Sequence, residues 1–269
     1  LATWWFSATH SLHSAYFTRI LVGLFGAFSA VGTMKLVTLL FPARRFALLA
    51  GLMMTIAMLG AVVGQGPLAL SVADFGWRYS MTLLAIIGAI LATLFFLLSR
   101  HKTESIPQHK SSFKHVLLGL KTIASNRNSW LIAAYSGLAF APINAFAGLW
   151  GIPFLTESYH MARPHMAGIV SLSFIGFAIG CPLAGWYSNF LGKRKPVMLW
   201  GTIIALICLS ICLYVPLAIW QLSLVMFVMG FFISFFFVSF AYINELNPHN
   251  CAGASIGFIN MFNALCGAV

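Results

Sequence analysis

Apolar segments of about 20 residues alternate with short polar joints along most of this chain, and about 20 apolar residues suffice for a helix to cross a bilayer. Proline or clustered charge marks the joints, as at residues 41–45 and 192–196. The pattern therefore predicts a series of membrane-spanning helices. We place the apolar segments at residues 1–9, 12–39, 46–70, 79–98, 129–155, 165–188, 196–215, 219–243 and 252–269.

Residues 99–128 form the one long polar stretch, in which basic side chains accompany a single acid, Glu104. Charge of this density cannot lie in hydrocarbon, so we expect this stretch to lie in water beside a membrane. It then links two membrane-embedded parts, residues 1–98 and residues 129–269.

Composition supports the same class. Hydrophobic residues make up 61% of the chain and charged residues 7%, against about 25% charged in soluble domains. Runs of this length favour helices over barrel strands, which would alternate over about ten residues. We expect an all-α membrane protein, a polytopic helical bundle. Because the first residue is Leu1 and both ends lie in apolar runs, we expect it to be incomplete at both ends.

The basic residues are distributed unevenly between alternate joints. Eleven of them lie on the side of the 99–128 stretch, and only Arg78 and Arg163 lie on the other. We expect the protein to lie in the cell (inner) membrane. By the positive-inside rule, residues 99–128 are then expected to lie in the cytoplasm. The net charge of +11 follows from this topology, so no nucleic-acid partner is expected.

A weak internal repeat relates the two parts. Pro42 is followed after nine residues by Gly51, and Pro248 after nine residues by Gly257. Both copies open a helix rich in small residues at a basic-side joint. We therefore expect two pseudo-symmetric halves, related as parallel repeats about the membrane normal.

Three motifs resemble those of the major facilitator superfamily. The stretch from Gly185 through Asn189 to Gly192, Lys193 and Arg194 resembles the GxLaDRxGRK loop motif between helices 8 and 9. Arg19-x3-Gly23 resembles the RxxxG of helix 4. Gly51, Gly60 and Gly64 resemble the glycine-rich motif of helix 5, here followed by Pro67.

The resemblance covers the whole chain, and the Gln65-Gly-Pro-Leu run is most similar to the sugar-phosphate-permease-like branch. It implies that residues 1–98 hold helices 3–6 and residues 129–269 helices 7–11. It also implies a secondary active transporter of a small polar or anionic solute, working by alternating access. A non-transporting receptor on the same scaffold and a drug or metabolite efflux antiporter are the alternatives.

Two departures from the family pattern bear on this expectation. Asn189 stands where the loop motif has Asp, and Phe190 where it has Arg. Asn189 can accept a hydrogen bond but carries no charge, so we expect a weaker cytoplasmic latch in this half. The helix 5 proline is displaced to Pro67, which weakens an assignment as antiporter.

Polar residues inside the spans are the candidates for the solute cavity. An arginine two turns inside a span is costly unless it is functional or paired, which singles out Arg19. Asn144 and Trp150 lie in a span interrupted by proline and glycine, and interrupted helices at the midplane often form substrate sites. Asn260 and Asn263 share one helix face.

Each of these candidates has a structural alternative. Arg19 could brace a helix, and the asparagines could bond neighbouring helices. Gly185, Asn189, Gly192, Lys193 and Arg194 are expected to form a cytoplasmic gating loop, or to serve only as an orientation anchor. Gly51, Gly60, Gly64 and Pro67 are expected to serve helix packing.

We expect that the protein is not an enzyme and that it has no cofactor and no metal site. The four acids are scattered, and His10 and His13 lack a third ligand nearby. The expected partners are a small-molecule solute, with or without a co-transported ion, and the lipid bilayer. We expect the protein to be monomeric.

Overall fold

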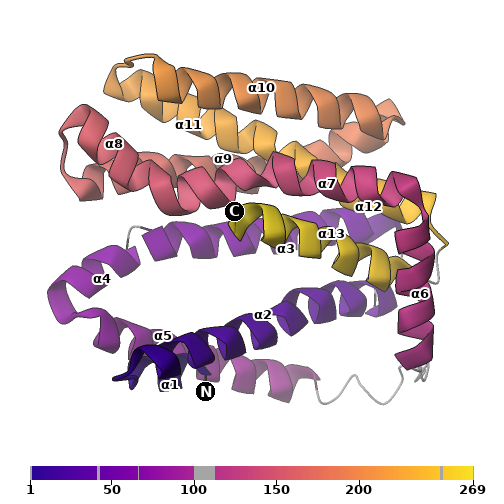
Figure 1. Ribbon diagram of the computed structural model, residues 1–269, viewed down its shortest axis with the longest axis horizontal. Coiled ribbons are helices and arrows are strands. Elements are labelled where there is room, and N and C mark those ends of the chain that lie inside the picture. Colours follow the sequence, from indigo (N-terminus) through magenta and orange to yellow (C-terminus); the bar gives the residue numbers. More distant parts are fainter. Residues whose placement is uncertain (1, 41–42, 66, 100–112, 249–250, 269) are drawn as a thin grey trace. The chain divides into compact units, whose positions relative to one another are not determined.

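The computed structural model describes residues 2–40, 43–65, 67–99, 113–248 and 251–268. Every regular element in these ranges is a helix, which confirms the prediction of an all-α protein (Figure 1). A chain this apolar must bond its backbone groups within each segment, because hydrocarbon offers them no partner. The elements are α1 (Ala2–Ser7), α2 (Leu12–Leu40), α3 (Ala43–Gln65), α4 (Pro67–Phe75), α5 (Trp77–Ser99), α6 (Phe113–Ser125), α7 (Arg127–Ala141), η2 (Pro142–Trp150), α8 (Gly151–Tyr159), α9 (Arg163–Leu191), α10 (Arg194–Tyr214), α11 (Ile219–Ile233), η3 (Ser234–Phe237), α12 (Val238–Leu246) and α13 (Ala252–Ala268).

Among the described residues, five helical stretches are long and apolar enough to cross a membrane. Gly51–Gly64 and Ala252–Gly267 are shorter apolar helices. These stretches coincide with the apolar segments seen in the sequence, so the prediction of a membrane-spanning bundle is confirmed. The five are Trp77–Leu98, Arg127–Tyr159, Arg163–Leu191, Arg194–Tyr214 and Ile219–Leu246.

The chain forms two compact units, and each unit combines two segments that are not consecutive in the sequence. Residues 1–40 and 67–110 form one, and residues 41–66 and 111–269 form the other. Helix α3 thus belongs to the second unit, although it precedes residues 99–128. The two repeated halves on either side of residues 99–128 are defined by their predicted symmetry and not by compactness. That division stays a prediction.

In the first unit, α1 contacts α2 and α5, and α4 contacts α5. Polar side chains are paired near the start of α5. An Nη2 of Arg78 donates to the carbonyl oxygen of Thr9 at 3.2 Å, and the hydroxyls of Ser71 and Ser80 lie 2.9 Å apart. These bonds satisfy groups that would otherwise be costly in an apolar bundle.

In the second unit, α9 lies between α3 and α11 and contacts both extensively. A Cβ built on Gly176 would meet the carbonyl oxygen of Phe227, and one on Gly230 would meet that of Ser173. The backbones of α9 and α11 are therefore in direct contact. Gly176 and Gly180 have the G-x-x-x-G spacing that permits such an approach in membranes.

The contact between α9 and α3 depends on a proline. Pro182 lies inside α9 and has no N–H, so the carbonyl of Ala178, four residues earlier, loses its helical partner. Thr55 of α3 fills that role, since its Oγ1 donates to the Ala178 oxygen at 2.8 Å. Gly51, one turn earlier on α3, packs against Pro182, whose Cα would lie 3.2 Å from a Cβ at that position.

Two spans of the second unit are irregular near their middle. The span from Arg127 to Tyr159 contains the π-helical segment η2, in which the N–H of Gly151 donates to the carbonyl oxygen of Phe146. The span from Ile219 to Leu246 contains the 3₁₀ segment η3. The sequence predicts the first irregularity from Pro142, Gly148 and Pro153, although the structure shows a wide turn and no break.

Helix α6 runs across the ends of α7 and α13, both of which it contacts (Figure 1). Ile123 is fully buried, and Gly119 faces Ala254 of α13 and the preceding Cys251. Leu117, Leu118 and Leu120 are exposed. This distribution fits an amphipathic helix that lies at a membrane surface.

Candidate functional site

The turn between α9 and α10 is short and held in one conformation. Gly192 ends α9 with a φ of 63°, a region that glycine enters without steric cost. Lys193 is then extended, and α10 begins at Arg194. The side chain of Arg194 is thereby directed back toward the end of α9.

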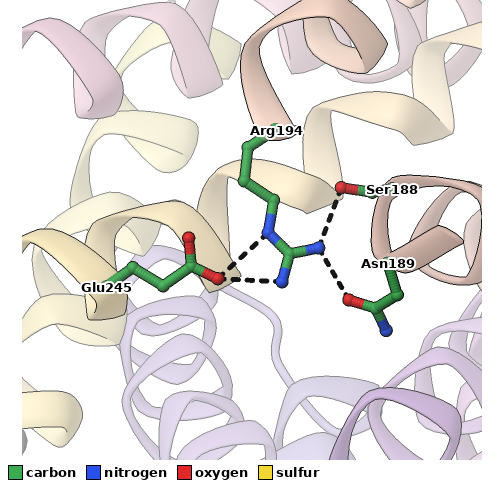
Figure 2. A network of polar contacts seen from close by, with 4 residues as sticks. All are labelled: Ser188, Asn189, Arg194 and Glu245. Atoms are coloured by element: carbon green, nitrogen blue, oxygen red, sulfur yellow. Dashed lines mark hydrogen bonds and ion pairs between the residues drawn. The ribbon is translucent and has the colours of Figure 1, made fainter. Parts of the chain in front are cut away.

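Arg194 is the centre of a polar network at this turn (Figure 2). Its Nε and Nη2 donate to Oε1 of Glu245 at 3.0 and 2.8 Å. Its Nη1 donates to Oγ of Ser188 at 2.9 Å and to Oδ1 of Asn189 at 2.7 Å. One guanidinium thus joins the end of α9, the start of α10 and the end of α12.

The network contains a negative charge, although Asn189 itself is uncharged. The carboxylate comes from Glu245 on α12, while Asn189 contributes an uncharged acceptor. The side chain of Arg194 is 21% exposed and that of Glu245 49%. A pair this accessible is worth on the order of 1 kcal/mol, so it can hold the helix ends together and still open.

Sequence reasoning singled out Asn189 and Arg194 but not Glu245 or Ser188. The signal for Glu245 was present, because it is one of only four acids in the chain. It could be linked to Arg194 only once the helix packing was known, since 51 residues separate the two.

A second polar cluster lies two residues beyond Glu245. The amide of Asn247 donates to the hydroxyl of Ser129 and to the carbonyl oxygen of Ile243, each at 2.9 Å. Asn126 caps α7 by accepting from the N–H of Asn128, and its own amide reaches the Asn247 oxygen at 3.3 Å. The end of α12 is therefore tied to the start of α7 as well as to α10.

The predicted cavity residues on α13 have different surroundings. Asn263 is buried and accepts a hydrogen bond of 2.8 Å from the hydroxyl of Ser136 on α7. The neighbouring Gly137 packs against the backbone of Phe262. Asn260 is half-buried and takes no part in this contact. Of the two asparagines, Asn263 therefore bonds a neighbouring helix, which is the structural alternative given for it above.

Asn144 and Trp150 both lie in the π-helical segment η2. Asn144 is half-buried, and its amide lies beside Gly267 of α13. Trp150 ends the segment and is 69% exposed. A Cβ built on Gly151 would lie 2.8 Å from the carbonyl oxygen of Phe146, so glycine is required for this wide turn.

Arg19 lies on α2 and is exposed within the first unit. Its guanidinium carbon is 4.5 Å from the centroid of the Phe6 ring on α1, a cation–π contact. Within the described part of the chain it has no carboxylate partner. The aromatic partner was not predicted, and it leaves the guanidinium N–H groups available.

The remaining predicted residues divide by packing. Of the three motif glycines on α3, only Gly51 is buried. Gly60 and Gly64 have open space where a Cβ would stand. Pro67 begins α4. Gly185 is half-buried on α9, with nothing within 4 Å of a built Cβ.

No group of three or more potential metal ligands is found among the described residues. The cysteines at 181, 208, 212, 251 and 266 form no disulfide with one another in the described part of the chain.

Comparison with known proteins gives two findings. The family model described as Major Facilitator Superfamily matches residues 1–269. A protein of Saccharomyces cerevisiae described as "Probable transporter MCH2" is 25% identical over 204 residues, which are 76% of this chain and 42% of that protein. The chain therefore spans less than half the length of this relative.

Proposed function

This chain belongs to the Major Facilitator Superfamily, and we propose that it works as part of a secondary active transporter that moves a small polar or anionic solute by alternating access. Such a transporter rocks two helical halves about a central site, so the helix ends within each half must stay joined while contacts between the halves form and break. The observation that carries the proposal is the network of Arg194 with Glu245 and Asn189. It is held by charge, it is partly exposed, and it joins three helix ends.

The contact between α3 and α9 supports the same mechanism. In the family frame these are helices 5 and 8, one from each half. Their contact is mostly apolar and includes one hydrogen bond at Thr55 and a small-residue crossing at Gly51. A contact of this kind can rearrange at the cost of breaking a single described hydrogen bond between the two helices.

Within the second unit we assign solute binding to Asn144, Trp150 and Asn260, with Asn263 beside them. For the first unit we assign it separately to Arg19. Asn144, Trp150, Asn260 and Arg19 each offer a polar group that is not fixed by a described hydrogen bond to another helix. An anionic solute is favoured because Arg19 lies about two turns into α2, whereas Asp74 and Glu157 lie near helix ends.

We place the protein in the cell membrane with the Lys193 end in the cytoplasm, since the basic residues cluster there. Impermeant thiol reagents should reach Lys193→Cys from the cytoplasmic side and Arg163→Cys from outside. Labelling of Lys193→Cys from outside would reverse the proposed orientation.

Counterflow in proteoliposomes tests the transport function. The full-length protein is first screened for thermal stabilisation by inorganic phosphate, sugar phosphates, organic carboxylates and neutral sugars. Vesicles loaded with the stabilising compound should then accumulate its radiolabelled form transiently. Stabilisation without counterflow would support the alternative, a receptor on the same scaffold, and would overturn the transport proposal.

A further inference from the structure

An open apolar groove lies along α9, α10 and α11, beside the turn that carries Arg194. Its volume is about 480 Å³. Aromatic rings dominate its walls. They include Trp186 and Tyr187 of α9, Trp200 of α10, Phe231 of α11 and Phe235 of η3.

Several of these rings are exposed although they stand in a groove. Trp186 is 65% exposed, Trp200 62% and Tyr187 43%. Trp and Tyr are enriched where a membrane-spanning helix meets the lipid headgroups, because their rings are apolar and their tips are polar. The groove is therefore suited to the boundary between acyl chains and headgroups.

Two lysines flank the base of α10, where the groove ends. Lys193 and Lys195 are exposed, and neither has an ion-pair partner in the described part of the chain. Glu245, the acid of this turn, is bound by Arg194. Lys195 also lines a neighbouring groove of about 440 Å³, which shares Pro196 and Trp200 with the first.

We propose that this groove is a binding site for an anionic phospholipid. One acyl chain occupies the aromatic groove, and the phosphate of the headgroup pairs with Lys193 and Lys195. Basic pockets between membrane helices select anionic headgroups, and an apolar chain fits walls that offer few hydrogen bonds. The site depends on the packing of α9, α10 and α11 alone, so it stands whether or not the protein transports a solute.

Tryptophan quenching by brominated lipid tests the site, because two of its walls are tryptophans. The full-length protein is placed in nanodiscs of phosphatidylcholine and titrated with phosphatidylglycerol brominated on its acyl chains. Phosphatidylcholine brominated in the same way is the reference lipid. We expect the anionic lipid to quench at about 25-fold lower mole fraction, since each of the two lysines near an anionic headgroup contributes about fivefold.

The double variant Lys193→Gln/Lys195→Gln should bring the two lipids to equal potency. The matched control, Lys121→Gln/Arg127→Gln, removes the same charge from the exposed face of α6 and the start of α7, and should keep the preference. Thermal unfolding of both variants checks that the fold is intact, as expected for exposed positions.

A third variant, Trp186→Phe/Trp200→Phe, should remove most of the extra quenching by the anionic lipid over the reference lipid, and so place the anionic lipid in this groove. The other six tryptophans remain as reporters of general lipid contact. Inorganic phosphate added in excess should not displace the lipid, because the acyl chain supplies part of the binding. Equal potency of the two lipids in the unmodified protein would overturn the proposal. So would a preference that survives in Lys193→Gln/Lys195→Gln or is lost to the same extent in the control.

Discussion

Thr55 on α3 donates a hydrogen bond of 2.8 Å to the carbonyl oxygen of Ala178 on α9. That oxygen is free because Pro182, four residues later, has no N–H to offer. A proline that weakens one helix thus creates the acceptor that holds a second helix against it. The bond joins a segment that precedes residues 99–128 to a segment that follows them.

Replacing Thr55 with Val should weaken this contact, because valine keeps the shape of threonine and removes the donor. We expect a loss of about 1 kcal/mol in the stability of the α3–α9 contact, seen as a lower unfolding temperature of the full-length protein in detergent. Thr93→Val is the control, since the Thr93 hydroxyl bonds only to Ala89 of its own helix. Equal effects of the two substitutions would show that the bond to Ala178 contributes nothing specific.

The pair of Arg194 and Glu245 should behave as a coupled unit. Glu245→Gln and Arg194→Lys are each expected to reduce solute counterflow severalfold, because lysine cannot form the forked contact and glutamine carries no charge. A double-mutant cycle should give a coupling of about 1 kcal/mol in stability. Glu157→Gln serves as control, because Glu157 is exposed and forms no ion pair with a described residue. Additive effects would mean that the contact does not couple the two helix ends.

Gly230→Ala should be strongly destabilising, since the new Cβ would meet the carbonyl oxygen of Ser173 on α9. The helices can accommodate it only by moving apart, at a cost of about 1–3 kcal/mol. Gly168→Ala, on α9 with open space at its Cβ, should leave stability unchanged or slightly raised. Thermal unfolding monitored by circular dichroism measures both. Similar unfolding temperatures for the two variants would contradict the close crossing of α9 and α11.

Asn263 and Asn260 should separate structural from solute-binding roles on α13. Asn263→Ala is expected to lower stability by about 1 kcal/mol, and adding Ser136→Ala should cost little more, because the two residues share one bond. Asn260→Ala should leave stability intact and raise the KM for counterflow. A destabilised Asn260→Ala protein with an unchanged KM would remove Asn260 from the proposed cavity.

Sequence periodicity predicts the helices well, because a membrane allows few alternatives. Apolar segments of the required length, ended by charge or proline, lie where α3, α5 and α7 to α13 form. The interruption at Pro142 and Pro153 was also predictable, since both residues remove backbone donors. The 3₁₀ segment η3 was not predictable, because no proline or glycine marks Ser234–Phe237.

The candidate site was predictable only in part. The loop motif led to Asn189 and Arg194, because their spacing along the chain is local. Glu245 and the bond of Thr55 to Ala178 could not be predicted, since partners 51 and 123 residues apart meet only through the packing of whole helices. The role of Asn263 was left undecided for the same reason, as its partner Ser136 lies on another helix.

Alternating access is tested most directly by the accessibility of one cavity position from both sides of the membrane. Asn144→Cys is introduced into the full-length protein from which the other cysteines have been removed. A membrane-impermeant thiol reagent is then applied to right-side-out and to inverted vesicles. We predict labelling from both sides, a shift of the ratio when the transported solute is saturating, and faster labelling from the cytoplasmic side when Glu245→Gln is added. Labelling from one side only, unaffected by the solute and by Glu245→Gln, would contradict the account.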